Sequence, residues 1–463
     1  MRTKHHDRLS AFLRLWAMIA CSYSAMKVHI GSHQLHRSGV SQHLQQQQQQ
    51  IPVIDYSEET HQRLYPILQP TIKLPVWPVY NGVIAQVLDW LKLSDLSNRL
   101  INALGGRVQP ISLASLDLSP FLLLVHHSHS FTPYDPFRAM TRWFLPEGFP
   151  AHPHSGFDTV TYCIRGGLRH RDSEGLSMRY GDGDVQWMRA GRGVIHEEMW
   201  DVQPGRYDRI EIFQLWVNLP GEKKFVIPSV AMLRRGDIPV VSTVDGCCSV
   251  KVICGEVTVD ESEAFSRPLP DEGSLPQTRR EGAVCGPGGA IAGSNIALLH
   301  LEMVPHSRVD IAVGGGRGGA VTAAAYVRRG CLSSSSSSSS SPVDDHDKGR
   351  GLASSSRMAF DQGSFVIFRP SEKEELSSLC GRVMTVTAGA DGLDALLLFG
   401  EPLGEQVIWQ GPFVQRSERD LLRSARAFEG IGREGFWDHQ LSDPEWERHV
   451  EELRLQETLT RLD

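Results

Sequence analysis

The feature that most constrains the fold is two pairs of potential metal ligands within residues 149–199. His152 and His154 form the first pair, and His196 and Glu198 form the second, with one residue between the members of each pair. On a β-strand, residues i and i+2 share one face, whereas on a helix they diverge by roughly 200°. Each pair can therefore aim at a single point only where the chain is extended.

The sequence around both pairs favours strands. The run 157–164 (FDTVTYCI) is rich in β-branched and aromatic residues and is closed by two glycines. The second pair follows a turn at 181–184 (GDGD) and the apolar run 185–188 (VQWM). Because Pro153 cannot donate to a sheet ladder, the first pair is expected at a strand mouth or a sheet edge. Two facing strands of a small barrel would then bring three imidazoles and one carboxylate together.

This donor set predicts a metal site. Imidazole and carboxylate together suit a divalent first-row transition metal; iron is favoured, and zinc, copper, manganese and nickel stay open. The alternative is a glycine-rich β-region whose histidines bind nothing, since histidines fall two apart by chance on many surfaces. The second pair, on a predicted strand of its own, favours the metal interpretation.

Three segments that contain these residues resemble the pirin family of two-domain cupins. They are HPHSGFDTVTY, GDVQWMRAGRGVIHEEM and the run 214–219 (QLWVNL). The likeness continues in 250–256 (VKVICGE) and in the late runs GEPL and VIWQGPFV, and covers most of residues 106–435. The resemblance implies an all-β fold of two tandem cupin barrels with a few flanking helices, with metal in the first barrel only.

The resemblance also implies a ligand set. In pirins the ligands are the two histidines of HPH and the His and Glu of the later HxE, which match His152, His154, His196 and Glu198. Asp158 stands where the family usually has Glu, at a position that is not a family ligand.

Composition and the resemblance together imply five segments. They are a leader (1–50), a helical extension (51–104), a metal-binding cupin (105–257), a second cupin (258–415) with a low-complexity insert (333–357), and C-terminal helices (416–463). The polyserine of the insert and the glutamine tract at 45–50 cannot build a packed core. Apolar residues recur at helical spacing over 83–93, which predicts a packing face.

The leader leaves the cellular location open. It carries six basic residues, one acidic residue and a short apolar run at 11–21 that Arg14 interrupts. This composition leans toward an organelle presequence, with a signal peptide or an untargeted leader as alternatives, and the run is too short to span a membrane. The resemblance instead implies the nucleus or cytoplasm. Eight cysteines without a CxxC motif favour a reducing compartment.

Other residues near the motifs are weaker candidates. His126, His127 and His129 lie at the start of an expected inserted loop at 128–143, so they are interpreted as polar loop residues, with a second metal site or a role at a pocket rim as alternatives. In the second cupin, His300 and His306 lie six residues apart and no HxE follows them. That half is therefore expected to bind no metal.

The strands next to the motifs carry further candidate side chains. Gln214, Trp187 and Trp216 are candidates to line a pocket, although tryptophans in such strands usually pack in the core. Glu197 alternates with the predicted ligands, so it should face outward, as should Arg189 and Arg192. Cys163 lies in an apolar run and is expected to be a buried small hydrophobe.

The C-terminal segment predicts two helices. Ser417 is a plausible N-cap with Asp420 three residues later, opening a helix through residue 427. The second, at 443–459, mixes glutamate and arginine at i,i+4 spacing and should be a solvated or partner-facing surface helix.

Charge and resemblance together limit the function. A net charge of −7 provides no basic surface for direct nucleic-acid binding. The resemblance implies either a quercetin 2,3-dioxygenase-type enzyme or an iron-dependent, redox-sensing transcription co-regulator. The enzyme would take a flavonol-like substrate and O2, with Glu198 as general base, whereas the regulator would bind a protein partner.

Overall fold

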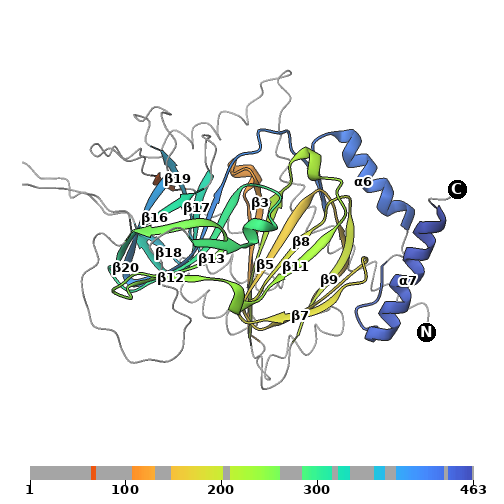
Figure 1. Ribbon diagram of the computed structural model, residues 1–463, viewed down its shortest axis with the longest axis horizontal. Coiled ribbons are helices and arrows are strands. Elements are labelled where there is room, and N and C mark those ends of the chain that lie inside the picture. Colours follow the sequence, from red (N-terminus) through yellow and green to blue (C-terminus); the bar gives the residue numbers. More distant parts are fainter. Residues whose placement is uncertain are drawn as a thin grey trace, which may run out of the picture. The chain divides into compact units, whose positions relative to one another are not determined.

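The computed structural model describes residues 64–68, 107–130, 147–201, 209–260, 284–314, 322–333, 359–370, 382–431 and 436–460 (Figure 1). They fall into two compact units. The first holds the described residues up to Arg235 other than 64–68, and those from Leu403 onward; the second holds 64–68 and the described part of Gly236–Pro402. The leader, the expected helix at 83–93 and nearly all of the insert at 333–357 lie outside the described residues. No helix in the described part is long and apolar enough to cross a membrane.

Both units are built from antiparallel strands, which confirms the all-β prediction. In the first unit a six-stranded sheet has the order β11-β8-β5-β10-β3-β2. Its strands are β2 (Arg107–Ser112), β3 (Phe121–Ser130), β5 (Phe157–Arg165), β8 (Val185–Arg189), β10 (Arg209–Asn218) and β11 (Ser229–Leu233). A four-stranded sheet has the order β4-β9-β6-β7 and comprises β4 (Gly148–His154), β6 (Gly167–Asp172), β7 (Ser177–Gly181) and β9 (Val194–Trp200).

The two sheets of the first unit face each other across a shared interior. One buried cluster joins Ile210 and Ile212 of β10 to Leu168 of β6 and Tyr180 of β7. Since side chains alternate along a strand, residues in register with these positions also face inward. Cys163 belongs to this cluster, so its interpretation as a buried small hydrophobe is confirmed.

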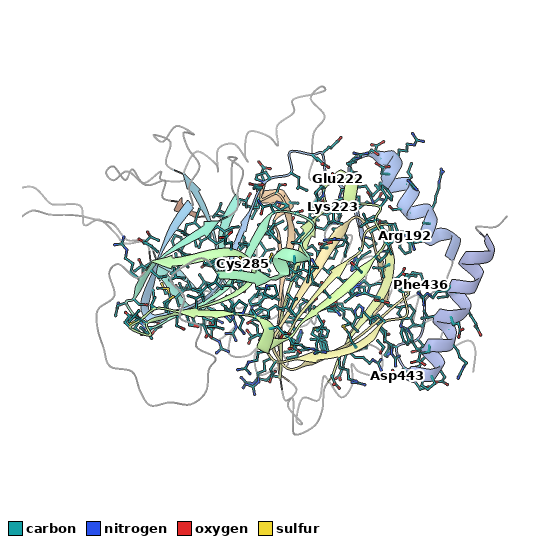
Figure 2. All side chains as sticks on the ribbon, in the orientation of Figure 1. Arg192, Glu222, Lys223, Cys285, Phe436 and Asp443 are labelled. Carbon is teal, nitrogen blue, oxygen red and sulfur yellow. The ribbon has the colours of Figure 1, made fainter. Side chains whose placement is uncertain are left out.

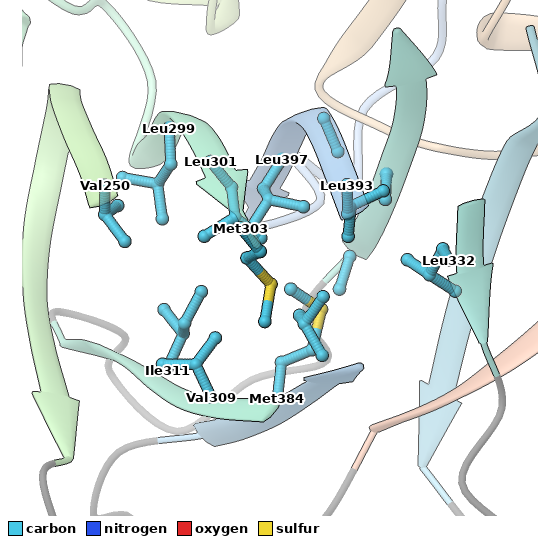
Figure 3. Close-up of a cluster of buried hydrophobic side chains, with 14 of the residues drawn as sticks. Val250, Leu299, Leu301, Met303, Val309, Ile311, Leu332, Met384, Leu393 and Leu397 are labelled. Atoms are coloured by element: carbon cyan, nitrogen blue, oxygen red, sulfur yellow. The ribbon is translucent and has the colours of Figure 1, made fainter. Parts of the chain in front are cut away.

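The second unit holds a ten-stranded sheet around a core of its own. The strands are β1 (Leu64–Leu68), β12 (Val240–Ser242), β13 (Cys248–Asp260), β14 (Val284–Pro287), β15 (Ile296–Met303), β16 (Arg308–Gly314), β17 (Thr322–Ser333), β18 (Ala359–Asp361), β19 (Phe365–Pro370) and β20 (Arg382–Gly400). Leu299, Leu301, Ile311 and Leu397 point into this core (Figure 3).

Short 3-10 helices lie between strands in both units: η1 (Ala114–Leu116), η2 (Gly221–Lys223), η3 (Arg235–Asp237) and η4 (Gly288–Ala290).

The division between the units differs from the expected boundaries at 257 and 415. β13 pairs along its length with β15 and β16 of the second sheet, so the chain enters the second unit before residue 248. Residues from Leu403 onward group with the first unit instead. There the hairpin of β21 (Ile408–Gln410) and β22 (Phe413–Gln415) bonds to the loop after β4, where Val414 N donates to Ser155 O over 3.0 Å.

Part of the extension expected to be helical is a strand. β1 pairs antiparallel with β19 at the edge of the second sheet. Pro66 lies in its middle, and an edge strand tolerates proline because one row of its amide groups needs no partner. Pairing with an existing sheet therefore decides the conformation of this segment.

Both C-terminal helices form as predicted. They are α6 (Glu418–Ile431) and α7 (Asp443–Thr460), and Ser417 Oγ accepts a hydrogen bond from Asp420 N as an N-cap. The second helix was expected to be a solvated or partner-facing surface helix, but one of its faces is buried. Trp446 and Val450 of α7 are buried against Ile195 of β9. Figure 2 shows Phe436 and Asp443 on the side of the first unit that carries α7.

Candidate metal centre

Three of the four predicted ligands come together inside the first unit. His152 and His154 lie on β4, His196 lies on β9, and His152 is directly in register with His196. One ring nitrogen from each imidazole lies within 4.8 Å of the other two. The Nε2 atoms of His152 and His154 are 3.1 Å apart. β4 is an edge strand, as Pro153 predicted, and the i,i+2 spacing places both of its histidines on one face.

The three imidazoles are neutral at physiological pH. Burial lowers the pKa of His152 to about 4 and holds the pKa values of His154 and His196 well below the usual range, and the neighbouring imidazoles add to the effect. The carbonyl of Pro150 accepts a hydrogen bond from Nδ1 of His152 over 2.8 Å. This bond fixes the tautomer and leaves the Nε2 lone pair free to bind a cation.

His196 tests whether a metal fits this cluster. Its side chain is fully buried, and neither ring nitrogen has a hydrogen-bond partner among the described residues. A buried polar group left without a partner costs about 1–3 kcal/mol. A cation bound by the three imidazoles would remove that cost, and neutral imidazoles are the ligands that divalent transition metals prefer. The donor set therefore fits such a metal.

Glu198, the fourth predicted ligand, is not part of the three-imidazole cluster. Its Oε1 accepts hydrogen bonds from Thr161 Oγ1 over 3.0 Å and from Tyr180 Oη over 3.1 Å. Its Oε2 accepts a hydrogen bond from Gln214 Nε2 over 2.6 Å. Burial raises the pKa of Glu198, against the opposing effects of His170 and of the three donors. The carboxylate is thus held beside the imidazoles by groups from three other strands.

A fourth imidazole lies beside the cluster and was not identified from the sequence. The ring centroid of His170 on β6 is 5.4 Å from that of His196. Its Nε2 lies 3.1 Å from Asp172 Oδ2, and both side chains are buried. The signal was present as a His-x-Asp pair that begins three residues after Gly167. Tyr180 and Thr161 were also missed, because a single hydroxyl on a strand carries no spacing pattern.

Two of the three pocket candidates contact the centre. The ring of Trp216 lies 5.1 Å from that of His154, and Gln214 binds the Glu198 carboxylate. Trp187 instead donates from Nε1 to Asp158 Oδ2 over 2.9 Å, so it packs away from the imidazoles. Arg189 Nε also donates to Asp158, over 3.1 Å.

The histidines of β3 are strand residues, so their interpretation as loop residues is wrong. Pairing with β10 continues through Ser130, which keeps the chain extended across the triplet. His127 and His129 share one face and are both buried. The ring of His127 lies 5.3 Å from Phe149, and that of His129 lies 4.4 Å from Trp200. Both contacts cross to the other sheet.

The back of β9 carries a buried ionic network. Glu197 faces away from the imidazoles, as predicted, but it is fully buried. Its Oε1 lies 3.2 Å from Arg169 Nη2 and 3.6 Å from Arg171 Nη1. Arg171 also pairs with Asp443 at the start of α7. The strand that bears His196 is therefore fixed on its other face by the C-terminal segment.

Lys224 anchors the loop after His154, and no sequence pattern marked it. Its buried ammonium donates to Gly156 O over 2.8 Å, to Asn218 Oδ1 over 2.6 Å and to Val414 O over 3.1 Å. Burial lowers its pKa to about 7. Gly156 has φ of +88°, and a Cβ there would lie 1.9 Å from Val414 O, so only glycine fits this approach.

The second unit brings three potential ligands together in a different way. His300, Glu302 and Asp394 offer atoms within 4.8 Å of one another. Asp394 Oδ1 lies 3.0 Å from His300 Nε2, and its other oxygen pairs with Arg328. An adjacent guanidinium repels a metal cation, so this group is an ion-pair cluster.

Two antiparallel β-units in one chain, with a three-imidazole cluster inside the first, define a bicupin. A family model described as Pirin matches residues 109–217, and one described as the Pirin C-terminal cupin domain matches 348–432. A pirin-like protein of Caulobacter vibrioides is 30% identical over 283 residues, covering 61% of this chain and 79% of that protein. The chain belongs to the pirin family.

Two further relatives agree with this placement. Pirin-like protein 2 of Arabidopsis thaliana is 31% identical over 305 residues, covering 65% of this chain and 76% of that protein. Human pirin is 38% identical over 178 residues, covering 38% of this chain and 54% of that protein. A quercetin 2,3-dioxygenase of Acinetobacter baumannii superposes with a TM-score of 0.48 and 24% identity, covering 71% of this chain and 91% of that one. At that TM-score the likeness adds nothing to the assignment of function.

Proposed function

We propose that the protein is a metal-dependent dioxygenase of quercetin 2,3-dioxygenase type, acting on a flavonol-like substrate with O2. The observation that supports this most directly is the position of Glu198. Its buried carboxylate lies two residues from His196 on the same face of β9, yet its hydrogen bonds come from Thr161, Tyr180 and Gln214. A carboxylate placed in this way beside a metal cluster suits a general base.

Three imidazoles would hold the metal, and Glu198 would move the proton. When bound, a transition metal supplies Lewis-acid and redox chemistry, with Fe(II) favoured and Mn, Ni, Cu or Zn as alternatives. Oε1 of Glu198 accepts two hydrogen bonds but Oε2 accepts one, which leaves Oε2 a lone pair for the 3-hydroxyl proton of a flavonol. The raised pKa of Glu198 brings its basicity closer to working pH.

The interior around the cluster suits a ligand with several hydroxyl groups. Inward-facing polar atoms on several strands have no hydrogen-bond partner among the described residues; they belong to Thr159, Gln186, His127 and His170. Buried polar atoms are nearly always paired in native proteins, so a bound polar molecule or water is expected there. The rings of Phe157 and Trp216, 4.4 Å apart, add an apolar wall that excludes bulk solvent.

The test is direct. The purified protein is loaded in turn with Fe(II), Mn, Ni, Cu or Zn and mixed with quercetin in air, and the loss of flavonol absorbance is compared with O2 uptake. We expect equal molar loss of flavonol and O2 with at least one metal, and none with the His196→Ala variant. Absence of turnover with every metal would contradict the proposal.

A second candidate, the iron-dependent redox-sensing co-regulator, is favoured by a different observation. Glu197 lies between His196 and Glu198 and is tied through Arg171 to Asp443 on α7, so the metal-bearing strand and a surface helix share one ionic network. In this proposal the iron oxidation state would alter the helix that a protein partner contacts. Hydrogen exchange of 443–460 should then differ between Fe(II)- and Fe(III)-loaded protein; equal protection would remove this candidate.

A further inference from the structure

The two faces of β3 place its histidines in different surroundings. His127 is in register with Ile212 of β10, which belongs to the buried cluster between the two sheets. His127 therefore faces the interior. His126 faces the other way: its ring stacks on Phe213 at 4.4 Å, and its Nε2 lies 3.0 Å from Glu211.

His127 lies close to the imidazole cluster. Its ring meets the edge of Phe149 at 5.3 Å, and Phe149 in turn lies 6.4 Å from the ring of His152. The ring of Phe149 thus lies beside both His127 and the predicted ligand His152. His129 lies on the same face of β3 as His127. Its ring is 6.0 Å from that of His127 and 4.4 Å from that of Trp200.

One ring nitrogen of His127 is available for a further hydrogen bond. The residue is 3% exposed, and its Nδ1 has no hydrogen-bond partner among the described residues. Burial and the neighbouring histidines hold its pKa well below the usual range, so the ring is neutral. A neutral imidazole has one donor and one acceptor nitrogen, and a hydroxyl group can satisfy either.

We propose that His127 is a specificity-determining residue, which forms a hydrogen bond through Nδ1 with a hydroxyl of a planar phenolic ligand, on the part remote from the metal. This inference rests on the proposed dioxygenase function and names a substrate contact for that site. A planar ring suits the wall formed by Phe149 and Trp200. A hydroxyl suits His127 better than a carboxylate does. The buried ring is neutral, so it offers no positive charge to pair with a buried carboxylate.

The experiment compares two flavonols that differ in the hydroxyls other than the 3-hydroxyl. Quercetin carries them, whereas 3-hydroxyflavone keeps the 3-hydroxyl and the carbonyl but lacks every other hydroxyl. Both are titrated anaerobically into the metal-loaded full chain, and affinity is measured by calorimetry. We expect His127→Phe to weaken quercetin binding about tenfold, the usual size for one hydrogen bond left unmade, and to leave 3-hydroxyflavone nearly unchanged.

Further variants at His127 and His126 serve as controls for this test. His127→Gln retains a donor and an acceptor, so it should recover most of the preference for quercetin. His127→Leu, which has neither, serves in place of His127→Phe if that variant does not fold. His126→Phe is the matched control on the opposite face and should leave both affinities as in the wild type. If His127→Phe weakens the binding of both flavonols equally, or of neither, the inference about His127 is wrong while the proposed function stands. Failure of the wild type to bind either flavonol would instead overturn the proposed function.

Discussion

Gln214 on β10 donates a hydrogen bond of 2.6 Å to the carboxylate of Glu198 on β9. This contact joins the two sheets of the first unit across their interior. Thr161 and Tyr180 also donate to this carboxylate, so Glu198 accepts hydrogen bonds from three side chains. None of these three side chains bonds to an imidazole of the cluster in the described residues. The carboxylate and the imidazoles can therefore have separate tasks, the first in proton transfer and the second in metal binding.

Replacing Glu198 by glutamine tests this division. The amide keeps the shape of the side chain but cannot take up a proton, so we expect Glu198→Gln to lower quercetin turnover by about 100-fold or more. Metal content, measured by elemental analysis, should stay near the wild-type value, because the three imidazoles remain. Loss of the metal together with activity would show instead that Glu198 is a ligand.

His196 and His170 form a matched pair for testing the metal site. Both are buried histidines 5.4 Å apart, but only His196 belongs to the three-imidazole cluster. We expect His196→Ala to abolish metal binding and the rise in melting temperature on adding metal, a stabilisation of about 2.7 kcal/mol when the metal is at 100 times its Kd. His170→Asn should keep both. Metal-dependent stabilisation that survives His196→Ala would contradict the site.

The metal-free protein should lose stability in acid through His152. The folded state lowers the pKa of this residue from 6.5 to about 4, so the unfolded chain binds the proton first. The free energy of unfolding therefore falls as pH drops from 6.5 toward 4, by at most about 1.4 kcal/mol per pH unit from this residue. His154 and His196 act in the same direction.

Urea unfolding at several pH values measures this slope. Replacement of His152 by glutamine removes one titrating group, so the variant should show a shallower dependence on pH than the wild type. Stability that is equal for the wild type at pH 6.5 and at pH 4 would refute the prediction.

The ionic network behind β9 should be a major source of stability. Arg171 is 1% exposed, and Arg171→Met would leave Glu197 buried with Arg169 alone. Breaking a buried pair by removing one partner costs about 3–5 kcal/mol, and the remaining contact places this variant near the lower end. Arg179→Met is the control, because its pair with Asp201 is exposed and such pairs contribute about 0–1 kcal/mol. Equal midpoints of urea unfolding for both variants would contradict this ranking.

The strands that carry the imidazoles were predictable because alternation is a local rule. The spacing of His152 with His154 fixed which side chains share a face, and Pro153 indicated the sheet edge on which β4 lies. The two C-terminal helices were predictable for the same reason, since Ser417 and Asp420 form a cap within one turn.

What could not be predicted depends on contacts between distant segments. Nothing near residue 224 indicates that its ammonium meets carbonyls of Gly156 and Val414. β13 belongs to the second sheet because of partners that come later in the chain. The interpretation of His127 as a loop residue could be corrected only from its pairing with β10.

The return of residues beyond Leu403 to the first unit has a consequence for biosynthesis. The strand pairs that hold His152, His154 and His196 leave the ribosome before the segment that hydrogen-bonds to Ser155 and packs on Ile195 has been translated. The first unit therefore stays incomplete until the segment up to residue 450 has been made. A premature stop codon before residue 403 would remove the contacts of that segment with Ser155 and Ile195.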